Sequence, residues 1–254
     1  MQLEQQLRHS LEKKEILLMT HIVLGYPSFE VNREVIRQMV ENGVDCIEMQ
    51  IPFSEPMADG PVIVRANQEA LDNGTKVADC LAFAAEMTAS HDIPFLFMTY
   101  YNIVFKYGEK SFFEKARECG IKGVIVPDLP PEEGESFLQL AMENEIAPIL
   151  IFAPTSTDER MQELASHGKG FIYCVARRGV TGVKSVIGAE VVEYLGRCRK
   201  ATGMPLAVGF GIQDRDDVNA LNGKADMAVI GSQTIRLVDE KGAAAVGPFI
   251  AGLR

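Results

Sequence analysis

The sequence contains no tryptophan, no Cys-x-x-Cys pair and no His-x-x-x-His pair among its 254 residues. Its five cysteines are odd in number and far apart, which favours free thiols in a reducing cytosol over a disulfide or zinc framework. The four histidines lack metal-ligand spacing, so we expect no metal site. No apolar run reaches membrane-spanning length, and residues 1–14 are typical of a charged amphipathic helix rather than a secretory signal.

Basic residues are in the minority, with 25 Lys and Arg against 35 Asp and Glu and a net charge of −10. A nucleic-acid partner requires a basic surface, so this balance argues against one. An anionic small-molecule substrate is still compatible with it, because backbone N–H groups and helix N-termini bind phosphate locally. Hydrophobic residues make up 47% of the chain, which is enough to form a large core.

Eight short apolar runs alternate with amphipathic stretches such as Phe29–Asn42 and Glu132–Asn144. The length of these runs and their β-branched content favour strands over pieces of helix. They are Ile16–Val23, Cys46–Ile51, Pro94–Tyr100, Gly123–Asp128, Ala147–Phe152, Gly170–Val175, Pro205–Phe210 and Met227–Ser232.

This strand-then-helix rhythm predicts an α/β protein with a parallel sheet. Eight such units in a chain near the typical ~250 residues favour a closed (β/α)8 TIM barrel over an open doubly wound sheet. No linker or low-complexity segment interrupts the rhythm, so we expect residues 1–254 to form one TIM-barrel domain with an extra N-terminal helix.

Glycine-rich segments stand at the ends of the last two predicted strands, where the active sites of such barrels lie. These are Gly209–Gly211 and Gly231–Ser232, and a third glycine-containing segment spans Gly179–Gly182. Glycine lets the backbone approach an anion closely, so the three segments together indicate phosphate binding. The alternative is that these glycines only form tight turns.

Three acidic residues stand at or near predicted strand ends. Glu48 lies inside an apolar strand, and the alternation predicts that it points into the barrel with Cys46 and Gln50. A poorly solvated carboxyl there can donate or accept a proton, although a salt-bridged structural role is the alternative. Asp59 and Asp128 each have a structural alternative too: Asp59 as a turn residue, and Asp128 as a turn residue or the cap of the helix that follows it.

Five segments carry a resemblance to a known family: "IEMQIPFSEPMADGP", "VPDLPPEE", "RRGVTG", "VGFGI" and "IGS". In motifs and order the chain resembles the tryptophan synthase alpha subunit from Ile16 to Ser232, and the first segment is the most specific. The resemblance implies a cytoplasmic carbon–carbon lyase that needs no cofactor. Such an enzyme cleaves indole-3-glycerol phosphate to indole and D-glyceraldehyde 3-phosphate by a retro-aldol reaction. Indole then passes to a beta subunit in an alpha2beta2 heterotetramer for tryptophan biosynthesis.

The resemblance also implies roles for individual residues. Glu48 matches the catalytic acid, which is also expected to act as base, and Asp59 matches the acceptor of the indole N–H. The implied substrate-binding residues are Tyr100, Tyr173, Thr181, Gly182, Gly211, Gly231 and Ser232. Among them, Tyr100 is expected beside the indole, the Thr181–Gly182 loop is expected to close over the site, and the last three are expected to hold phosphate. Glu55 and Asn102 match the partner-facing surface.

Three residues depart from the family pattern. Gln50 stands where the family usually has Gly, Glu55 replaces an Asp, and His21 replaces an aromatic residue of the indole pocket. The two proposed acids are intact, so these changes bear on partner coupling and affinity more than on reaction type. Three alternatives are a free-standing lyase, a non-catalytic activating partner of a beta subunit, and a sugar-phosphate isomerase barrel, which would lack the "PFSEPMADGP" loop.

Overall fold

Eight parallel strands close into a barrel in the computed structural model, which describes residues 2–175, 188–209 and 211–254. Each strand pairs with the next along the chain, and β8 pairs with β1. The strands are β1 (Leu17–Val23), β2 (Cys46–Gln50), β3 (Phe95–Met98), β4 (Gly123–Ile125), β5 (Ala147–Phe152), β6 (Ile172–Val175), β7 (Leu206–Gly209) and β8 (Met227–Ile230). The predicted (β/α)8 barrel is therefore confirmed.

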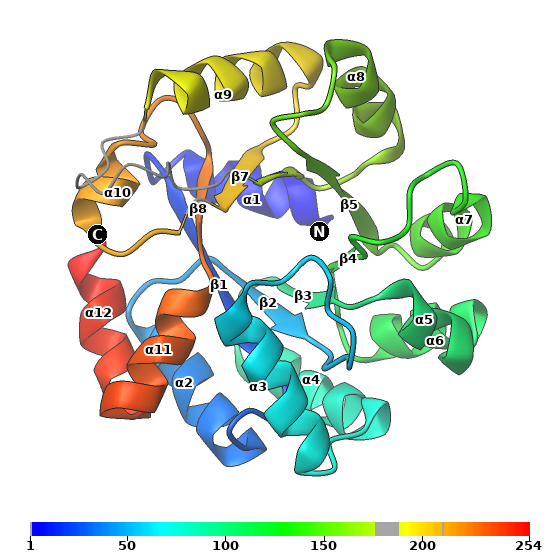
Figure 1. The fold of residues 1–254 in the computed structure, drawn as a ribbon, viewed down its shortest axis with the longest axis vertical. Coiled ribbons are helices and arrows are strands. Elements are labelled where there is room, and N and C mark those ends of the chain that lie inside the picture. The colour runs from blue at the N-terminus through cyan, green and yellow to red at the C-terminus, as the bar shows by residue number, and fades with distance from the viewer. Residues whose placement is uncertain (1, 176–187, 210) are drawn as a thin grey trace.

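Helices surround the strands as an outer ring, except for α1, which lies behind the barrel (Figure 1). In the described residues they are α1 (Leu3–Leu11), α2 (Phe29–Glu41), α3 (Pro61–Asp72), α4 (Val77–Ser90), α5 (Tyr101–Tyr107), α6 (Glu109–Glu118), α7 (Glu135–Glu143), α8 (Asp158–His167), α9 (Ala189–Ala201), α10 (Arg215–Asn219), α11 (Ser232–Lys241), η1 (Ala243–Ala245) and α12 (Val246–Gly252). Helix α1 is the extra N-terminal helix that the sequence predicts.

The two faces of the strands supply two separate hydrophobic cores. On β2, Ile47 and Met49 pack in the core that lies between the strands and the helices. Cys46 belongs to the smaller core inside the barrel. Since side chains alternate along a strand, Glu48 and Gln50 share the interior face with Cys46, as the sequence predicts.

Helix α1 closes one end of the barrel. Its Leu3 and Leu7 are buried in the interior core, and in Figure 1 the helix lies behind the centre of the barrel. Gly170 has φ +84°, and a Cβ there would lie 2.8 Å from the Leu3 side chain, so only glycine fits beside the helix. The space for chemistry is therefore at the other end, where the carboxyl ends of the strands meet.

Strand β4 is shorter than the sequence predicts, because it ends at Ile125 rather than Asp128. Pro127 lacks the backbone N–H that a continued strand would need. Residues 126–128 leave the barrel, and this change in direction determines where Asp128 lies.

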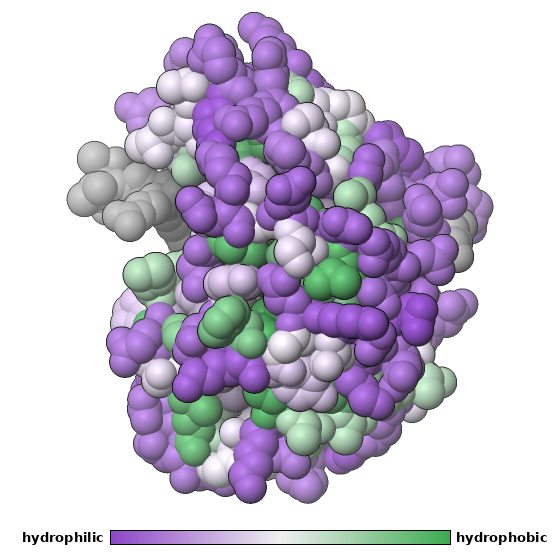
Figure 2. All heavy atoms as spheres, turned by 90° about the vertical axis from the view of Figure 1, so that its right-hand side faces the viewer, coloured by the Kyte–Doolittle hydropathy of each residue, from purple (hydrophilic) through white to green (hydrophobic). Residues whose placement is uncertain are grey.

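The face of the molecule seen in Figure 2 is mostly hydrophilic, with hydrophobic residues in small groups. Among the described residues no helix is both long and apolar enough to cross a membrane. All five cysteines are buried as free thiols.

Candidate active site

The first acid of the site, Glu48, is paired with a histidine on the neighbouring strand. His21 lies opposite Glu48 in the β1–β2 register, and its Nδ1 is 2.9 Å from Glu48 Oε1. Both residues are only 4% exposed. Glu48 Oε2 and His21 Nε2 have no hydrogen-bond partner among the described residues. Glu48 is thus a paired strand residue, as the structural alternative supposed, and it also presents a free oxygen at the barrel interior.

The second acid, Asp59, is held by Gln50 at the end of β2 and by Tyr100, the residue before α5. Gln50 Nε2 donates to Asp59 Oδ2 at 2.7 Å, and the Tyr100 hydroxyl donates to the same oxygen at 3.0 Å. The Tyr100 oxygen in turn accepts the Ala58 backbone N–H at 3.1 Å. Neither side-chain bond uses Oδ1, which leaves that oxygen for another donor. A turn role alone would not require this support.

Burial and neighbouring groups shift the proton affinities of this cluster. Burial raises the pKa of Asp59 above the ordinary 3.8, although His21, Gln50 and Tyr100 act in the opposite direction. Burial by itself would lower the pKa of His21, but the Glu48 carboxylate, by charge and by hydrogen bond, raises it above 6.5. The pKa of Asp59 is therefore higher than that of an exposed aspartate, and the pKa of His21 is higher than that of a buried histidine without a carboxylate neighbour.

Tyr100 and Phe53 form the wall behind Asp59. Tyr100 is fully buried in the interior core, and its ring stacks on Phe53 with centroids 5.0 Å apart. Burial raises the pKa of Tyr100, and the nearby Asp59 charge adds to this, so the phenol keeps its proton and donates it. The sequence placed Tyr100 beside the substrate, but its support of Asp59 and the role of Phe53 depend on contacts that only the fold reveals.

Tyr173 reaches the same space from β6. Burial raises the pKa of its hydroxyl, and the charges of Glu48 and Asp59 raise it further, so the phenol stays neutral near the two acids. A Cβ at Gly209 would lie 3.0 Å from the Tyr173 ring. Glycine on β7 is therefore what allows the ring to occupy this position.

The expected phosphate residues lie at the ends of β7 and β8. Gly211 has φ +75°, a conformation that favours glycine and supports the tight-turn alternative at that position. Gly231 immediately precedes α11, whose first residue is Ser232, so backbone N–H groups are presented here. A Cβ at Gly211 or Gly231 would meet no atom within 4 Å, so packing alone does not require either glycine. Thr181 and Gly182 lie outside the described residues.

Asp128 is a cap, but of a different helix from the one predicted. Its carboxylate accepts the Tyr101 backbone N–H at 2.9 Å and 3.2 Å, at the start of α5, which precedes it in the chain. The sequence suggested the following helix. The difference arises because β3 and β4 are neighbours, so the loop after β4 reaches the helix that begins after β3.

Glu55 and Asn102 are both exposed, in segments that follow the carboxyl ends of β2 and β3. Asn102 lines a groove of about 540 Å³ together with Phe53, Ser54 and Ile103. Met57, in the loop that holds Glu55, is 82% exposed, and Phe105, on the same helix as Asn102, is 65% exposed. Both apolar side chains are therefore open to solvent. Exposed apolar side chains beside a groove are typical of a surface that binds another protein.

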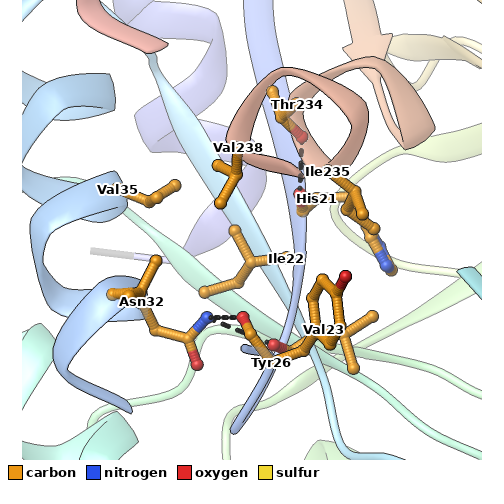
Figure 3. A pocket seen from close by; sticks show the side chains of 10 residues that line it. His21, Ile22, Val23, Tyr26, Asn32, Val35, Thr234, Ile235 and Val238 are labelled. Carbon is orange, nitrogen blue, oxygen red and sulfur yellow. Dashed lines mark hydrogen bonds between the residues drawn. The ribbon is translucent and has the colours of Figure 1, made fainter. Parts of the chain in front are cut away.

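A small cavity behind β1 is separate from the acids (Figure 3). It measures about 20 Å³ and lies between β1, α2 and α11, where it could hold about one water molecule. His21 contributes its carbonyl oxygen, 3.2 Å from the Thr234 hydroxyl, and its side chain extends away from Val35 and Val238. The cavity is too small for a substrate.

Fold and site together define a (β/α)8-barrel protein with two supported carboxylates at the carboxyl ends of its strands. The sequence profile of the tryptophan synthase alpha chain family matches residues 7–247. The chain belongs to this family.

Proteins and solved structures that are similar to this chain match it over nearly its whole length. The tryptophan synthase alpha chain of Desulfotalea psychrophila is 68% identical over 254 residues, covering 100% of both chains. That of Syntrophotalea carbinolica is 56% identical, covering 99% of this chain and 100% of its own. A Mycobacterium tuberculosis tryptophan synthase structure matches with TM-score 0.89 and 30% identity, covering 97% of this chain and 95% of that one. A tryptophan synthase complex from Pyrococcus furiosus matches with TM-score 0.85 and 29% identity, covering 93% and 97%.

Proposed function

We propose that this protein is a tryptophan synthase alpha subunit that cleaves indole-3-glycerol phosphate to indole and D-glyceraldehyde 3-phosphate. The observation that carries the proposal is the pair of supported carboxylates, Glu48 and Asp59, inside a family member with full-length relatives of that name. The reaction is a retro-aldol cleavage. One carbon–carbon bond breaks, one proton is added to the ring carbon, and one is removed from the glycerol hydroxyl.

Glu48 is the acid at the ring carbon that bears the side chain. Protonation there makes indole a better leaving group, and the electrons of the broken carbon–carbon bond return to the ring. The same carboxyl group takes the proton of the glycerol hydroxyl that becomes the aldehyde. Its free oxygen, Oε2, faces the barrel interior and supports this role.

Asp59 accepts the indole N–H and stabilises the positive charge that develops on the protonated ring. The hydrogen bonds from Gln50 and Tyr100 fix one oxygen, and the other is left to the substrate. Phe53 and Tyr100 supply a flat apolar wall of the kind an indole ring packs against.

The phosphate group is placed at the ends of β7 and β8, on Gly211, Gly231 and Ser232. The start of α11 supports this placement, because the partial positive charge and free N–H groups of a helix N-terminus favour an anion. Thr181 and Gly182 belong to the same proposal as parts of a closing loop, on the family resemblance alone.

The partner is a tryptophan synthase beta subunit in an alpha2beta2 assembly, in a cytoplasmic setting. The exposed Glu55 and Asn102, with Met57 and Phe105 uncovered nearby, support a docking surface at this mouth. The similarity of this chain to a chain of the Pyrococcus furiosus tryptophan synthase complex supports assembly with a partner.

The test is cleavage of indole-3-glycerol phosphate by the purified protein, with and without the beta subunit of the same organism. Slow cleavage alone and faster cleavage in a complex are expected. Full activity alone with no complex at micromolar concentration would favour a free-standing lyase. No cleavage, together with activation of the beta subunit, would favour the non-catalytic partner.

A further inference from the structure

Two residues that depart from the family pattern, His21 and Gln50, each contact one of the proposed acids. His21 Nδ1 is 2.9 Å from Glu48 Oε1, and Gln50 Nε2 donates to Asp59 Oδ2 at 2.7 Å. A hydrocarbon ring at position 21 or a glycine at position 50 could make neither contact. The two departures therefore add polar support to the site rather than only filling it.

Each of these two side chains also has a second polar atom. His21 Nε2 and Gln50 Oε1 are buried, and neither has a partner among the described residues. The Gln50 side chain lies close enough to contribute to raising the pKa of His21, after the larger effects of burial, Glu48 and Asp59. The contact that the ring does make, between Nδ1 and the Glu48 carboxylate at 2.9 Å, favours the protonated imidazole.

We propose that His21 is a positioning residue that holds Glu48 in place and keeps a proton available to it during the reaction. The inference rests on the proposed function of Glu48. In the proposed resting state His21 is protonated, so the buried His21–Glu48 pair holds one proton that it can pass on. Glu48 delivers a proton to the indole ring carbon and is resupplied by the glycerol hydroxyl, so the proton count of the pair is restored in each cycle.

The surroundings of His21 leave few other groups to share this proton. Among the described residues, the other titratable side chains near His21 or Glu48 are Cys46, Asp59 and Tyr173. Burial raises the pKa of the Cys46 thiol and of the Tyr173 phenol far above neutrality. From α11, the Thr234 hydroxyl donates to the His21 carbonyl oxygen and not to its ring. The Cys46 and Tyr173 protons are therefore held too tightly to exchange near neutral pH.

Two variants separate positioning from proton supply. His21→Phe removes both. His21→Asn keeps an N–H donor near the Nδ1 position but cannot titrate in this range. We expect His21→Phe to lower kcat by at least about tenfold, less than the roughly 10²–10⁴ expected for loss of the acid itself, with KM little changed. Near neutral pH, kcat of His21→Asn is expected to lie between those of His21→Phe and the wild type. The dependence of kcat on pH in this variant should lack the alkaline limb that His21 gives the wild type.

Histidine NMR tests the pairing without any turnover. The chain has four histidines, and either His21 variant identifies the His21 signal by its absence. We expect the pKa of His21 to lie above 6.5 in the wild type and to fall below 6.5 in Glu48→Gln, where burial is no longer opposed by the carboxylate. The exposed His9, 3.1 Å from Glu12, is the internal control and should not change.

The inference is overturned if the pKa of His21 lies below 6.5 in the wild type, or does not respond to Glu48→Gln. It is also overturned if both His21 variants keep the wild-type kcat and pH profile. Absence of indole-3-glycerol phosphate cleavage by the wild type would instead contradict the proposed function, so the two failures are distinguishable.

Discussion

Replacing Tyr100 with phenylalanine removes one oxygen atom from the support of Asp59. The ring of Tyr100 is fully buried and stacked on Phe53, and the substitution leaves both features in place. Two hydrogen bonds are lost: the one donated to Asp59 Oδ2 at 3.0 Å and the one accepted from the Ala58 N–H at 3.1 Å. The variant therefore tests the support of the carboxylate separately from packing.

The cost in stability follows from the character of these two bonds. A hydrogen bond to a charged group contributes about 1.5–3 kcal/mol, and a neutral one about 0.5–1.5 kcal/mol. Ala58 is exposed and Asp59 is only partly buried, so water replaces much of what is lost. We expect Tyr100→Phe to lower the free energy of unfolding by about 1–2 kcal/mol, measured by urea denaturation.

The effect on pH dependence has a definite sign. Burial raises the pKa of Asp59 above 3.8, and the hydrogen bond from Tyr100 is one of the contacts that lower it. Loss of that bond raises the pKa further. Asp59 must be ionised to stabilise the positive ring, so activity falls as pH falls through its pKa. The acid limb of kcat should therefore move to higher pH in Tyr100→Phe, with kcat reduced at every pH.

The matched control is Tyr101→Phe, the same substitution at the next residue. The Tyr101 hydroxyl donates to Glu109 at 3.0 Å, away from Asp59, so the acid limb should not move. An unchanged acid limb and unchanged kcat in Tyr100→Phe would show that Asp59 does not depend on this bond, and the reasoning would be wrong.

Three further predictions concern other parts of the site. Asp59→Asn should lower kcat strongly and leave the fold intact in circular dichroism, because it removes a charge from the barrel mouth; wild-type kcat would exclude the role given to Asp59. Gly209→Ala should lower stability by roughly 1–3 kcal/mol and reduce turnover, since its Cβ would lie 3.0 Å from the Tyr173 ring; thermal melts and assays that match the wild type would contradict this contact. Gly231→Ala should raise KM more than it lowers kcat, because it adds a methyl group in open space at the start of α11; an unchanged KM would mean that the phosphate binds elsewhere.

Much of the fold follows from local patterns in the sequence. The eight apolar runs and the amphipathic stretches between them are each short-range signals, and they identify the strands of the barrel. The error at β4 is also local, since Pro127 stops the ladder before the apolar run ends. The inward direction of Glu48 follows from alternation, because a strand has a side-chain period of two.

The site is less predictable, because its contacts join segments that are distant in the chain. The His21–Glu48 pair spans 27 residues and depends on the register of β1 against β2. The bond from Tyr100 to Asp59 spans 41 residues and depends on where a loop folds back. The sequence marked His21 and Gln50 as departures, but only the three-dimensional arrangement reveals that each contacts one acid.

The most direct test of the account is the rate of indole-3-glycerol phosphate cleavage by the wild type and by Glu48→Gln, each with the beta subunit present. The account predicts turnover by the wild type and a loss of roughly 10²–10⁴ in kcat for the variant, with complex formation retained in gel filtration. Near-normal cleavage by Glu48→Gln in an intact complex would contradict the central role of this carboxyl group.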